Sequence, residues 1–595
     1  MDKEVMMKKN RVAQWAFDTG PLLARFHLWL EDVETEWFQG GHLSRLQDSI
    51  SFVDAEMERM FMMTAAVTAL GTQLFGRYGE GRNLDKKGLN QVKKDADAIS
   101  AYAMSESLWH LSRSLPENHA IMVCLGEGLM PKAGETPEMG SNPLLGFGRI
   151  YARPQVARFL YAKVQRLINS NNYKWEDFYR DVIDAGITVW GAAIDTLENT
   201  SRFALGAATG PMTVLHVFNQ PLCLAKPYEG YVGNLVLPRR VADTAAGDSL
   251  LLNFFTPRSK VLECIQKTYP GIRSGNIHVW TLRGKSRAHR ISRIWEEWQS
   301  LGADLIDDGW KLPNGGEAFT DSGTYAPTFR VGTWNDSRRD THLFLVDGYA
   351  ASAEAIQAAS LYPILGLDVS LAVFTSTFEL SYDREPRIMS LDAEAEDFPL
   401  RLLKIFEKEI DAQTVERYRA NIRQARSAGI PLDKAVLAAD DFLPLKKWSV
   451  MAISGYMLPD PYSGAPGIHR SGDGTYQVSV RLSTPKGDKR TRFTLRLLEP
   501  FDQSRLIFNP LLNRFLHGEN YQERQVTISD SGRIRNELQT LCTEALEHFG
   551  DGFIRLHFKN IPADVISPQD QRKLREILQW YKENHPIWFK WLELV

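Results

Sequence analysis

The sequence has few cysteines and places them far apart. Its 595 residues include four, Cys124, Cys223, Cys264 and Cys542, and none of them forms a C-x-x-C pair. A disulfide framework is typical of short, cysteine-rich chains, and a structural zinc site uses closely spaced ligands. We therefore expect reduced, buried thiols, as in a reducing cytosol.

The sequence also lacks an uninterrupted apolar stretch long enough for a bilayer. A membrane-spanning helix needs about 20 apolar residues. Residues 60–75 lack charges but are shorter, and residues 203–225 are interrupted by glycine, proline and polar side chains. The first ten residues, MDKEVMMKKN, contain no apolar core of a signal peptide. We expect a soluble, cytoplasmic protein that does not bind membranes.

Neither sign of charge dominates. Lysine and arginine number 70 and aspartate and glutamate 73, so the net charge is −3. Nucleic acid is therefore not an expected partner, because such proteins usually carry a basic excess. Hydrophobic residues at 44% and charged residues at 24% are typical of a globular protein with a buried core. At roughly 100–200 residues per domain, the length corresponds to three or four structural units.

Several functional fingerprints are missing. Gly284-Lys285-Ser286 resembles part of a P-loop, but Val279 occupies the position of the glycine that the motif requires. No G-x-G-x-x-G segment opens a helix after a strand, so a dinucleotide site is not predicted. The G-x-S-x-G elbow of hydrolases and the histidine–glutamate spacing of zinc enzymes are absent as well.

The clearest positive pattern is an alternation of apolar strands with amphipathic helices. It runs through predicted strands at 213–218, 233–237, 249–255, 276–282, 304–306, 341–346 and 369–374 and helices at 257–268 and 286–301. Strands that are apolar on both faces and alternate with helices favour a parallel sheet covered on both sides. The predicted fold class is α/β, with a central, mostly parallel sheet, flanking helices, an all-helical N-terminal region and a smaller α+β C-terminal domain.

Changes in pattern along the chain suggest five segments. They are a helical N-terminal region at 1–118; a strand, a Gly/Pro-rich loop and helices at 119–205; an α/β core with the candidate ligand site at 206–390; a helical connector at 391–456; and an α+β domain at 457–595. The first segment is predicted to be helical throughout, and a further helix is predicted at 175–199. Residues 476–483 and 490–498 alternate with period two, which predicts a hairpin. Whether the Gly/Pro-rich loop at 126–148 belongs to the site is left open.

Residues 339–374 predict a βαβ unit, and its turn is the usual place for ligand chemistry. Thr341–Val346 is the first strand, Asp347-Gly348-Tyr349 the turn, 350–361 the helix and Val369–Phe374 the second strand. Two similar strand-to-helix junctions precede it, at 255–260 and 282–287. Helix N-termini attract phosphate and carboxylate, and parallel strands end at one edge, so the three junctions are predicted to converge on one anion site.

The candidate site residues follow from these junctions and from a nearby glycine-rich insertion. Substrate binding is predicted for Arg258, Ser259, Arg283, Lys285, Ser286, Ser352 and Arg330. Catalysis is predicted for Asp307, Asp308, Asp347 and His289. Paired carboxylates at a strand end would accept Mg²⁺, the one cofactor that the pattern suggests. The competing interpretation is an ordinary turn at Asp308-Gly309. His278 and His342 lie on predicted strands, where burial is favoured over ligand binding.

These patterns support two hypotheses. The first is an enzyme for a small phosphorylated or carboxylated metabolite, with isomerase or lyase chemistry slightly favoured because nucleotide fingerprints are missing. The second is a non-catalytic assembly or regulatory protein in which the helical and C-terminal regions are docking modules. A homo-oligomer fits either hypothesis. RNA binding through the basic hairpin at 481–496 is a weaker third, because few aromatic side chains are available for stacking.

Overall fold

The computed structural model describes about three fifths of the chain. The described residues are 28–37, 53, 55–126, 145, 148–170, 172–223, 231–250, 252–281, 288–313, 317–320, 325–351, 366–373, 387–388, 390–407, 409–427, 436–438, 449–457, 465–472, 475–484 and 486–497. The predicted elements beyond residue 497 lie outside these ranges.

A nine-stranded sheet forms the larger half of the described structure. Its strands are β1 (Leu28–Trp37), β2 (His119–Gly126), β3 (Arg149–Ala152), β4 (Thr188–Glu198), β5 (Met212–Phe218), β13 (Ser449–Gly455), β14 (Ile468–Gly472), β15 (Thr475–Thr484) and β16 (Gly487–Leu497). The order is β1-β16-β15-β13-β5-β4-β2-β3, with β14 beside β15. β2 and β4 run parallel, whereas the other paired strands of this first sheet are antiparallel.

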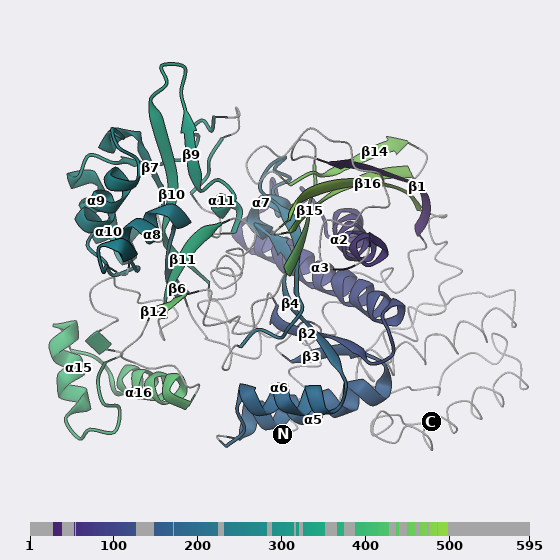
Figure 1. Ribbon diagram of the computed structural model, residues 1–595, viewed down its shortest axis with the longest axis horizontal. Helices are drawn as coiled ribbons and strands as arrows, with labels where there is room; N and C mark the ends of the chain where they lie inside the picture. The colour runs from purple at the N-terminus through teal and green to yellow at the C-terminus, as the bar shows by residue number, and fades with distance from the viewer. Residues whose placement is uncertain are drawn as a thin grey trace, which may run out of the picture.

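Helices α2 (Ala55–Phe75) and α3 (Lys86–Ser114) pack on this first sheet (Figure 1). α2 contacts β5, β13 and β15, and α3 contacts β2, β3 and β4. Helices α5 (Pro154–Asn169) and α6 (Trp175–Asp184) pack on β2, β3 and β4, and the short α7 (Thr200–Ala204) packs on α3. A buried ion pair between Glu58 and Lys489, 3.3 Å apart, ties α2 to β16.

A seven-stranded sheet carries the candidate site. Its strands are β6 (Tyr231–Pro238), β7 (Ile277–Trp280), β8 (Asp304–Leu305), β9 (Gly332–Asn335), β10 (Thr341–Ala351), β11 (Leu367–Val373) and β12 (Val436–Ala438). The order is β12-β11-β6-β10-β7-β8, with β9 beside β10. Only the β10–β7 and β7–β8 pairs are parallel in the described part of this second sheet.

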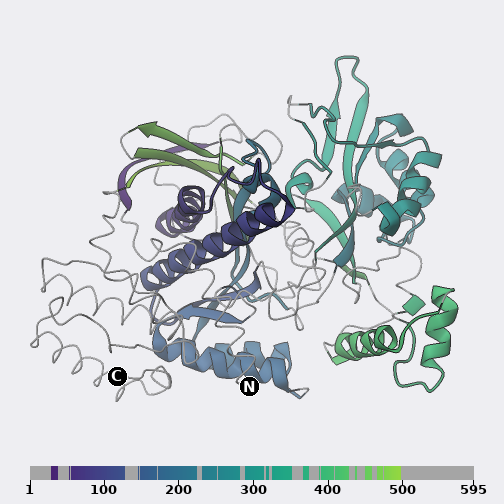
Figure 2. The same ribbon diagram turned by 180° about the vertical axis from the view of Figure 1, so that it is seen from behind.

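Helices α8 (Arg239–Gly247), α9 (Arg258–Thr268) and α10 (Ala288–Ser300) lie together beside the second sheet (Figures 1 and 2). A 3₁₀ turn, η2 (Ser274–Asn276), leads into β7, and the short α11 (Tyr325–Thr328) precedes β9. Helices α15 (Phe398–Phe406) and α16 (Ala412–Ser427) form a separate small cluster around Phe398, Leu402 and Tyr418.

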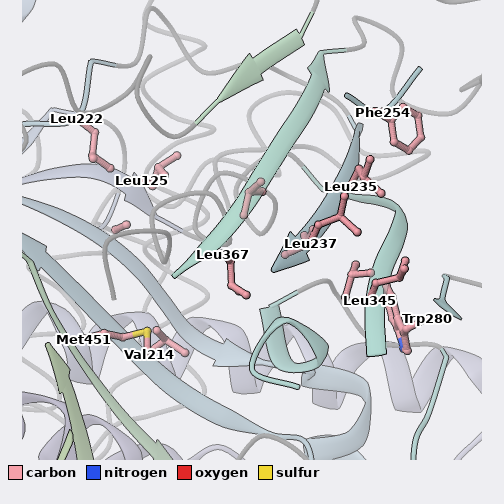
Figure 3. Close-up of a cluster of buried hydrophobic side chains, with 14 of the residues drawn as sticks. Leu125, Val214, Leu222, Leu235, Leu237, Phe254, Trp280, Leu345, Leu367 and Met451 are labelled. Carbon is pink, nitrogen blue, oxygen red and sulfur yellow. The ribbon is translucent and has the colours of Figure 1, made fainter. Parts of the chain in front are cut away.

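One hydrophobic cluster joins the two sheets (Figure 3). Val214 and Met451 enter it from the first sheet, and Leu235 and Leu345 from the second. Burying an apolar side chain of this size contributes roughly 1.5–3 kcal/mol relative to leaving it exposed. The two sheets are therefore held together by a continuous core within the described residues.

The protein has both helices and sheets, as predicted, but a mostly parallel central sheet is wrong. β10 and β11 lie on opposite sides of β6 and both run antiparallel to it. The prediction failed because apolar residues on both faces of a strand indicate only that both faces of its sheet are covered by other elements. Strand direction depends on pairing between distant segments, which that pattern does not encode.

Local predictions also failed at four places. Residues 28–37 were predicted to be helical but form β1, which pairs with β16. The predicted helix at 175–199 ends at Asp184, and its second half forms β4. Residues 252–256 form a turn in which the Asn253 side chain accepts the backbone N–H of Phe255 at 2.9 Å. The predicted turn at 347–349 is strand, because these residues pair with Leu235, Asn234 and Gly233 of β6.

The five predicted segments stay a prediction. The first sheet takes β2 and β4 from the second segment, β5 from the third, β13 from the fourth and β16 from the fifth. The predicted hairpin at 476–498 is confirmed as the antiparallel pair β15 and β16.

Candidate functional site

The first and third predicted junctions meet directly. Arg258, the first residue of α9, donates from Nε to Asp347 Oδ2 at 2.7 Å and from Nη2 to Oδ1 at 2.5 Å. Asp347 lies on β10, and both side chains are fully buried. Trp298 of α10 donates its indole N–H to the same carboxylate at 2.6 Å. Residues of two of the three predicted junctions are therefore in contact, and the contact is a closed ion pair.

The remaining donors of Arg258 are also engaged. Its Nη1 donates to the carbonyl oxygens of Phe254 at 2.6 Å and Thr256 at 2.9 Å. A two-pronged pair of this kind is the strongest form of arginine–carboxylate contact. Arg258 and Asp347 thus neutralise each other, and neither presents a charge to solvent. The substrate-binding and catalytic roles predicted for them would require this pair to open.

The N-terminus of α9 is occupied as well. The backbone N–H of Arg258 donates to Glu297 Oε2 of α10 at 3.1 Å. A carboxylate at this position satisfies one of the unpaired N–H groups and complements the helix dipole, as a bound anion would. Ser259 is exposed on the first turn of α9, beside Lys260, whose ammonium group binds Glu263. The first junction is therefore satisfied by the protein itself.

The second junction starts beside this ion pair. β7 and β10 pair in parallel as far as Trp280 and Val346, so Thr281 and Asp347 are the next residues on each strand. Thr281 is fully buried, and its hydroxyl has no hydrogen-bond partner within the described ranges. Such a buried, unpaired hydroxyl costs free energy unless something nearby accepts or donates to it.

Arg283, Lys285, Ser286 and Ser352 lie outside the described residues. His289 lies in the first turn of α10, directly after the basic segment 282–287. Arg330 follows α11 and is half-buried.

Asp307 and Asp308 lie in a turn after β8. Asp308 Oδ1 accepts the backbone N–H of Thr320 at 2.6 Å and its hydroxyl at 2.9 Å. Gly309 follows with a φ of 85°, a conformation that glycine adopts without strain. In the described ranges, no three histidine, cysteine, aspartate or glutamate side chains gather as metal ligands would. These contacts match the turn that the sequence offered as the alternative to a Mg²⁺ site.

A cluster that the sequence did not predict as a site lies on the opposite face of the second sheet. His278 of β7 contacts Asp304 of β8 through Nδ1 at 2.6 Å and His342 of β10 through Nε2 at 2.9 Å. The other nitrogen of His342, Nε2, lies 3.6 Å from Asp336 Oδ2. Side chains alternate across a strand, so His278 faces away from the helices that hold Asp347.

Two tryptophans cover the imidazoles. Trp334 of β9 stacks on His278 and on His342, with ring centroids 5.3 Å apart in both cases. Trp310 contacts His278 from the turn after β8, with ring centroids 4.9 Å apart. The two imidazoles are nearly coplanar, with 6° between the ring planes. The four polar groups therefore form a row that is open to solvent mainly at its two carboxylates, whose side chains are 40% (Asp304) and 32% (Asp336) exposed.

Asp336 has a perturbed pKa. Desolvation is the largest single influence and raises it, but two backbone N–H donors and the neighbouring His342 imidazole outweigh that effect. The backbone N–H groups of Asp340 and Arg338 donate to Oδ1 at 2.8 and 2.9 Å, and the His342 imidazole faces Oδ2. The pKa of Asp336 therefore lies below its ordinary value, and the carboxylate stays ionised at neutral pH.

The sequence predicted burial for both histidines, and His278 is buried while His342 is largely covered. Their contact was missed because it depends on β7 lying beside β10. A signal was present, since the predicted strands 276–282 and 341–346 of the same sheet each place a histidine within their first three residues.

The fold and these sites define an α/β protein of two mixed sheets with a shared core. No protein-family model matches the chain, and no curated protein has a similar sequence. Among the described helices, none combines the length and the apolarity needed to cross a membrane.

Proposed function

We propose that this protein is an enzyme that binds a small anionic metabolite, phosphorylated or carboxylated, at the carboxyl end of β7, beside Asp347 in the middle of β10. The observation that carries the proposal is the contact between Arg258 and Asp347, because it joins two of the three predicted junctions. The second junction, 282–287, follows directly after Thr281, which lies beside Asp347 on the neighbouring strand. Ligands of open α/β sheets commonly bind at such strand ends.

The ligand's charge would be met by the basic junction. Arg258 is neutralised by Asp347, and the N-terminus of α9 is occupied by Glu297. Arg283 and Lys285 are then the cations that remain for the anion, with Ser286 and Ser352 as hydroxyl donors and the N-terminus of α10 directly behind them. In this proposal Arg258 and Asp347 position the site rather than touch the ligand.

Acid–base chemistry would come from His289 at the start of α10 or from the exposed pair Asp307 and Asp308, which would also accept Mg²⁺. Isomerase or lyase chemistry and a cytosolic location remain part of the proposal.

A thermal-shift screen tests it with inorganic phosphate, a sugar phosphate and citrate, each with and without MgCl₂. A ligand at about 100 times its dissociation constant should add about 2.7 kcal/mol of stability. The Lys285→Ala variant should lose most of this shift. Lys260→Ala is the matched control, because Lys260 is an exposed lysine of α9 that already binds Glu263.

If none of these anions shifts the midpoint, the enzyme hypothesis loses its support and the assembly alternative is favoured. A shift that survives Lys285→Ala unchanged would place the anion elsewhere and contradict the proposed site.

A further inference from the structure

Arg149, the first residue of β3, is a half-buried cation on the first sheet. Its guanidinium lies over the ring of Tyr151, with Cζ 5.7 Å from the ring centroid, and it interacts with the hydroxyl groups of Tyr151 and Tyr161. Its Nε is buried and has no hydrogen-bond acceptor within the described residues. In the same part of the chain, no carboxylate forms an ion pair with Arg149.

Other covered arginines of the protein do have carboxylate partners. Arg258 binds Asp347, and both side chains are fully buried. Arg481 of β15, whose side chain is 21% exposed, binds Asp488 at 2.8 Å. Taking a cation out of water is costly unless an opposite charge lies beside it. Arg149 is covered in a similar way to Arg481, but its contacts supply no opposite charge.

The two tyrosines do not provide the missing charge. Burial raises the pKa of Tyr151 to about 12, although the Arg149 guanidinium opposes this effect, so the Tyr151 hydroxyl is neutral at neutral pH. It lies 2.7 Å from Ser105 Oγ of α3. The Tyr161 hydroxyl of α5 donates its hydrogen to the Ile150 carbonyl at 3.3 Å and accepts the Ile150 N–H at 3.2 Å. The tyrosines therefore position the guanidinium and leave its positive charge uncompensated.

We propose that Arg149, Tyr151 and Tyr161 form a binding site for a small oxyanion, a carboxylate or a phosphate group, at the outer edge of the first sheet. Such a group accepts two parallel hydrogen bonds from the planar guanidinium and supplies the negative charge that the described contacts lack. The Tyr151 ring supports the cation from one side. The site is separate from the anion site proposed at the carboxyl end of β7, because it lies on the other sheet.

An anion reaches this position without opening the sheet. β3 is the last strand in the order of the first sheet, so its outer edge pairs with no further described strand. Tyr161 takes up the backbone N–H and C=O of Ile150 at this edge. Arg149 is partly exposed beside it. The guanidinium is therefore both fixed by its neighbours and accessible from solvent.

Hydrogen–deuterium exchange of the peptides that cover β3 and α5 tests the proposal, with inorganic phosphate, acetate and chloride as probes at equal ionic strength. We expect phosphate or acetate to slow exchange in these peptides more than chloride does, because binding stabilises the folded structure around the site. The stronger of the two identifies the ligand as a phosphate or a carboxylate group.

Two variants of Arg149 separate its charge from its shape. Arg149→Met should lose the slowing. In chloride alone it should unfold at the same or a higher temperature than the unmodified protein, because a covered cation without a described counter-ion has been removed. Arg149→Lys keeps the charge but not the planar fork, so the anion should bind about 10- to 100-fold more weakly.

Arg481→Met is the matched control. Arg481 is also a covered arginine on a strand of the first sheet, and its Cζ lies 6.0 Å from the ring centroid of Phe329, but it binds Asp488. This variant should unfold at a lower temperature, because Asp488 loses its partner, and it should keep the response to anions. Lys285→Ala should keep it as well, which distinguishes this site from the anion site of the proposed function.

Equal exchange in phosphate, acetate and chloride would overturn the proposal. A slowing that survives Arg149→Met, or that Lys285→Ala abolishes, would place the anion elsewhere and overturn it too. If Arg149→Met does not fold, the weaker binding expected of Arg149→Lys decides, and unchanged affinity in that variant would contradict the site.

Discussion

The buried pair of Arg258 and Asp347 makes a quantitative prediction. Removing one member of a buried ion pair leaves an uncompensated charge and costs about 3–5 kcal/mol, whereas replacing both with apolar residues costs far less. We therefore expect Arg258→Met and Asp347→Leu each to destabilise the second sheet by about 3–5 kcal/mol. The double variant should be destabilised by much less than the sum, since neither charge is then left alone.

Smaller losses remain in the double variant. The indole N–H of Trp298 loses its acceptor, and the carbonyls of Phe254 and Thr256 lose their donor. Each lost hydrogen bond costs about 1 kcal/mol net. The double variant should therefore be roughly 1–3 kcal/mol less stable to unfolding than the unmodified protein. The coupling energy between Arg258 and Asp347 should exceed about 2 kcal/mol.

The assay must isolate the second sheet, because a chain of 595 residues need not unfold in one step. Hydrogen exchange in increasing urea, measured on peptides that cover α9 and β10, gives the local free energy of unfolding. The matched control is the exposed pair of Lys267 and Asp248, also 2.5 Å apart, whose side chains are 58% and 47% exposed. The same set of single and double variants at Lys267 and Asp248 should give a coupling energy of about 0–1 kcal/mol.

A single Asp347→Leu change that costs less than about 1 kcal/mol would refute the reasoning. It would mean that the pair is open to water, and Asp347 would then regain its predicted role as a residue that contacts ligand.

Two further predictions concern other sites. Burial lowers the pKa of His216 on β5 to about 3, so the unfolded chain binds a proton that the folded protein excludes between that pH and roughly 6.5. Between pH 6 and pH 4, unfolding curves should show that the unmodified protein loses more stability than the His216→Gln variant, by about 1.4 kcal/mol per pH unit. Equal losses in the two proteins would contradict the assignment. Asp308→Ala removes the acceptor of both hydrogen bonds from Thr320 and should lower the free energy of unfolding in urea by roughly 1–2 kcal/mol. An unchanged urea midpoint would show that the turn does not need the Asp308 carboxylate.

The sequence determined the elements whose signals are local. The apolar stripes of α9 and α10 and the period-two pattern of β15 and β16 each specify their own conformation, because the buried face is set by residues a few positions apart. The prediction that three junctions converge on one anion site stays a prediction, and the described residues show only that Arg258 of the first junction contacts Asp347 of the third. The turn pattern did not predict that Arg258 and Asp347 would form a buried ion pair.

The tertiary structure decided what distant residues do to one another. β1 is a strand because β16 offers it a partner from the other end of the chain, and β10 continues past Asp347 because β6 pairs with it there. Whether Arg258 is a ligand-binding cation or half of a buried pair depends on which carboxylate lies opposite it. The same holds for His278 and His342, which are two ordinary strand residues in the sequence and one hydrogen-bonded row in the folded protein. Pairing and burial act across hundreds of residues, and local pattern carries no record of them.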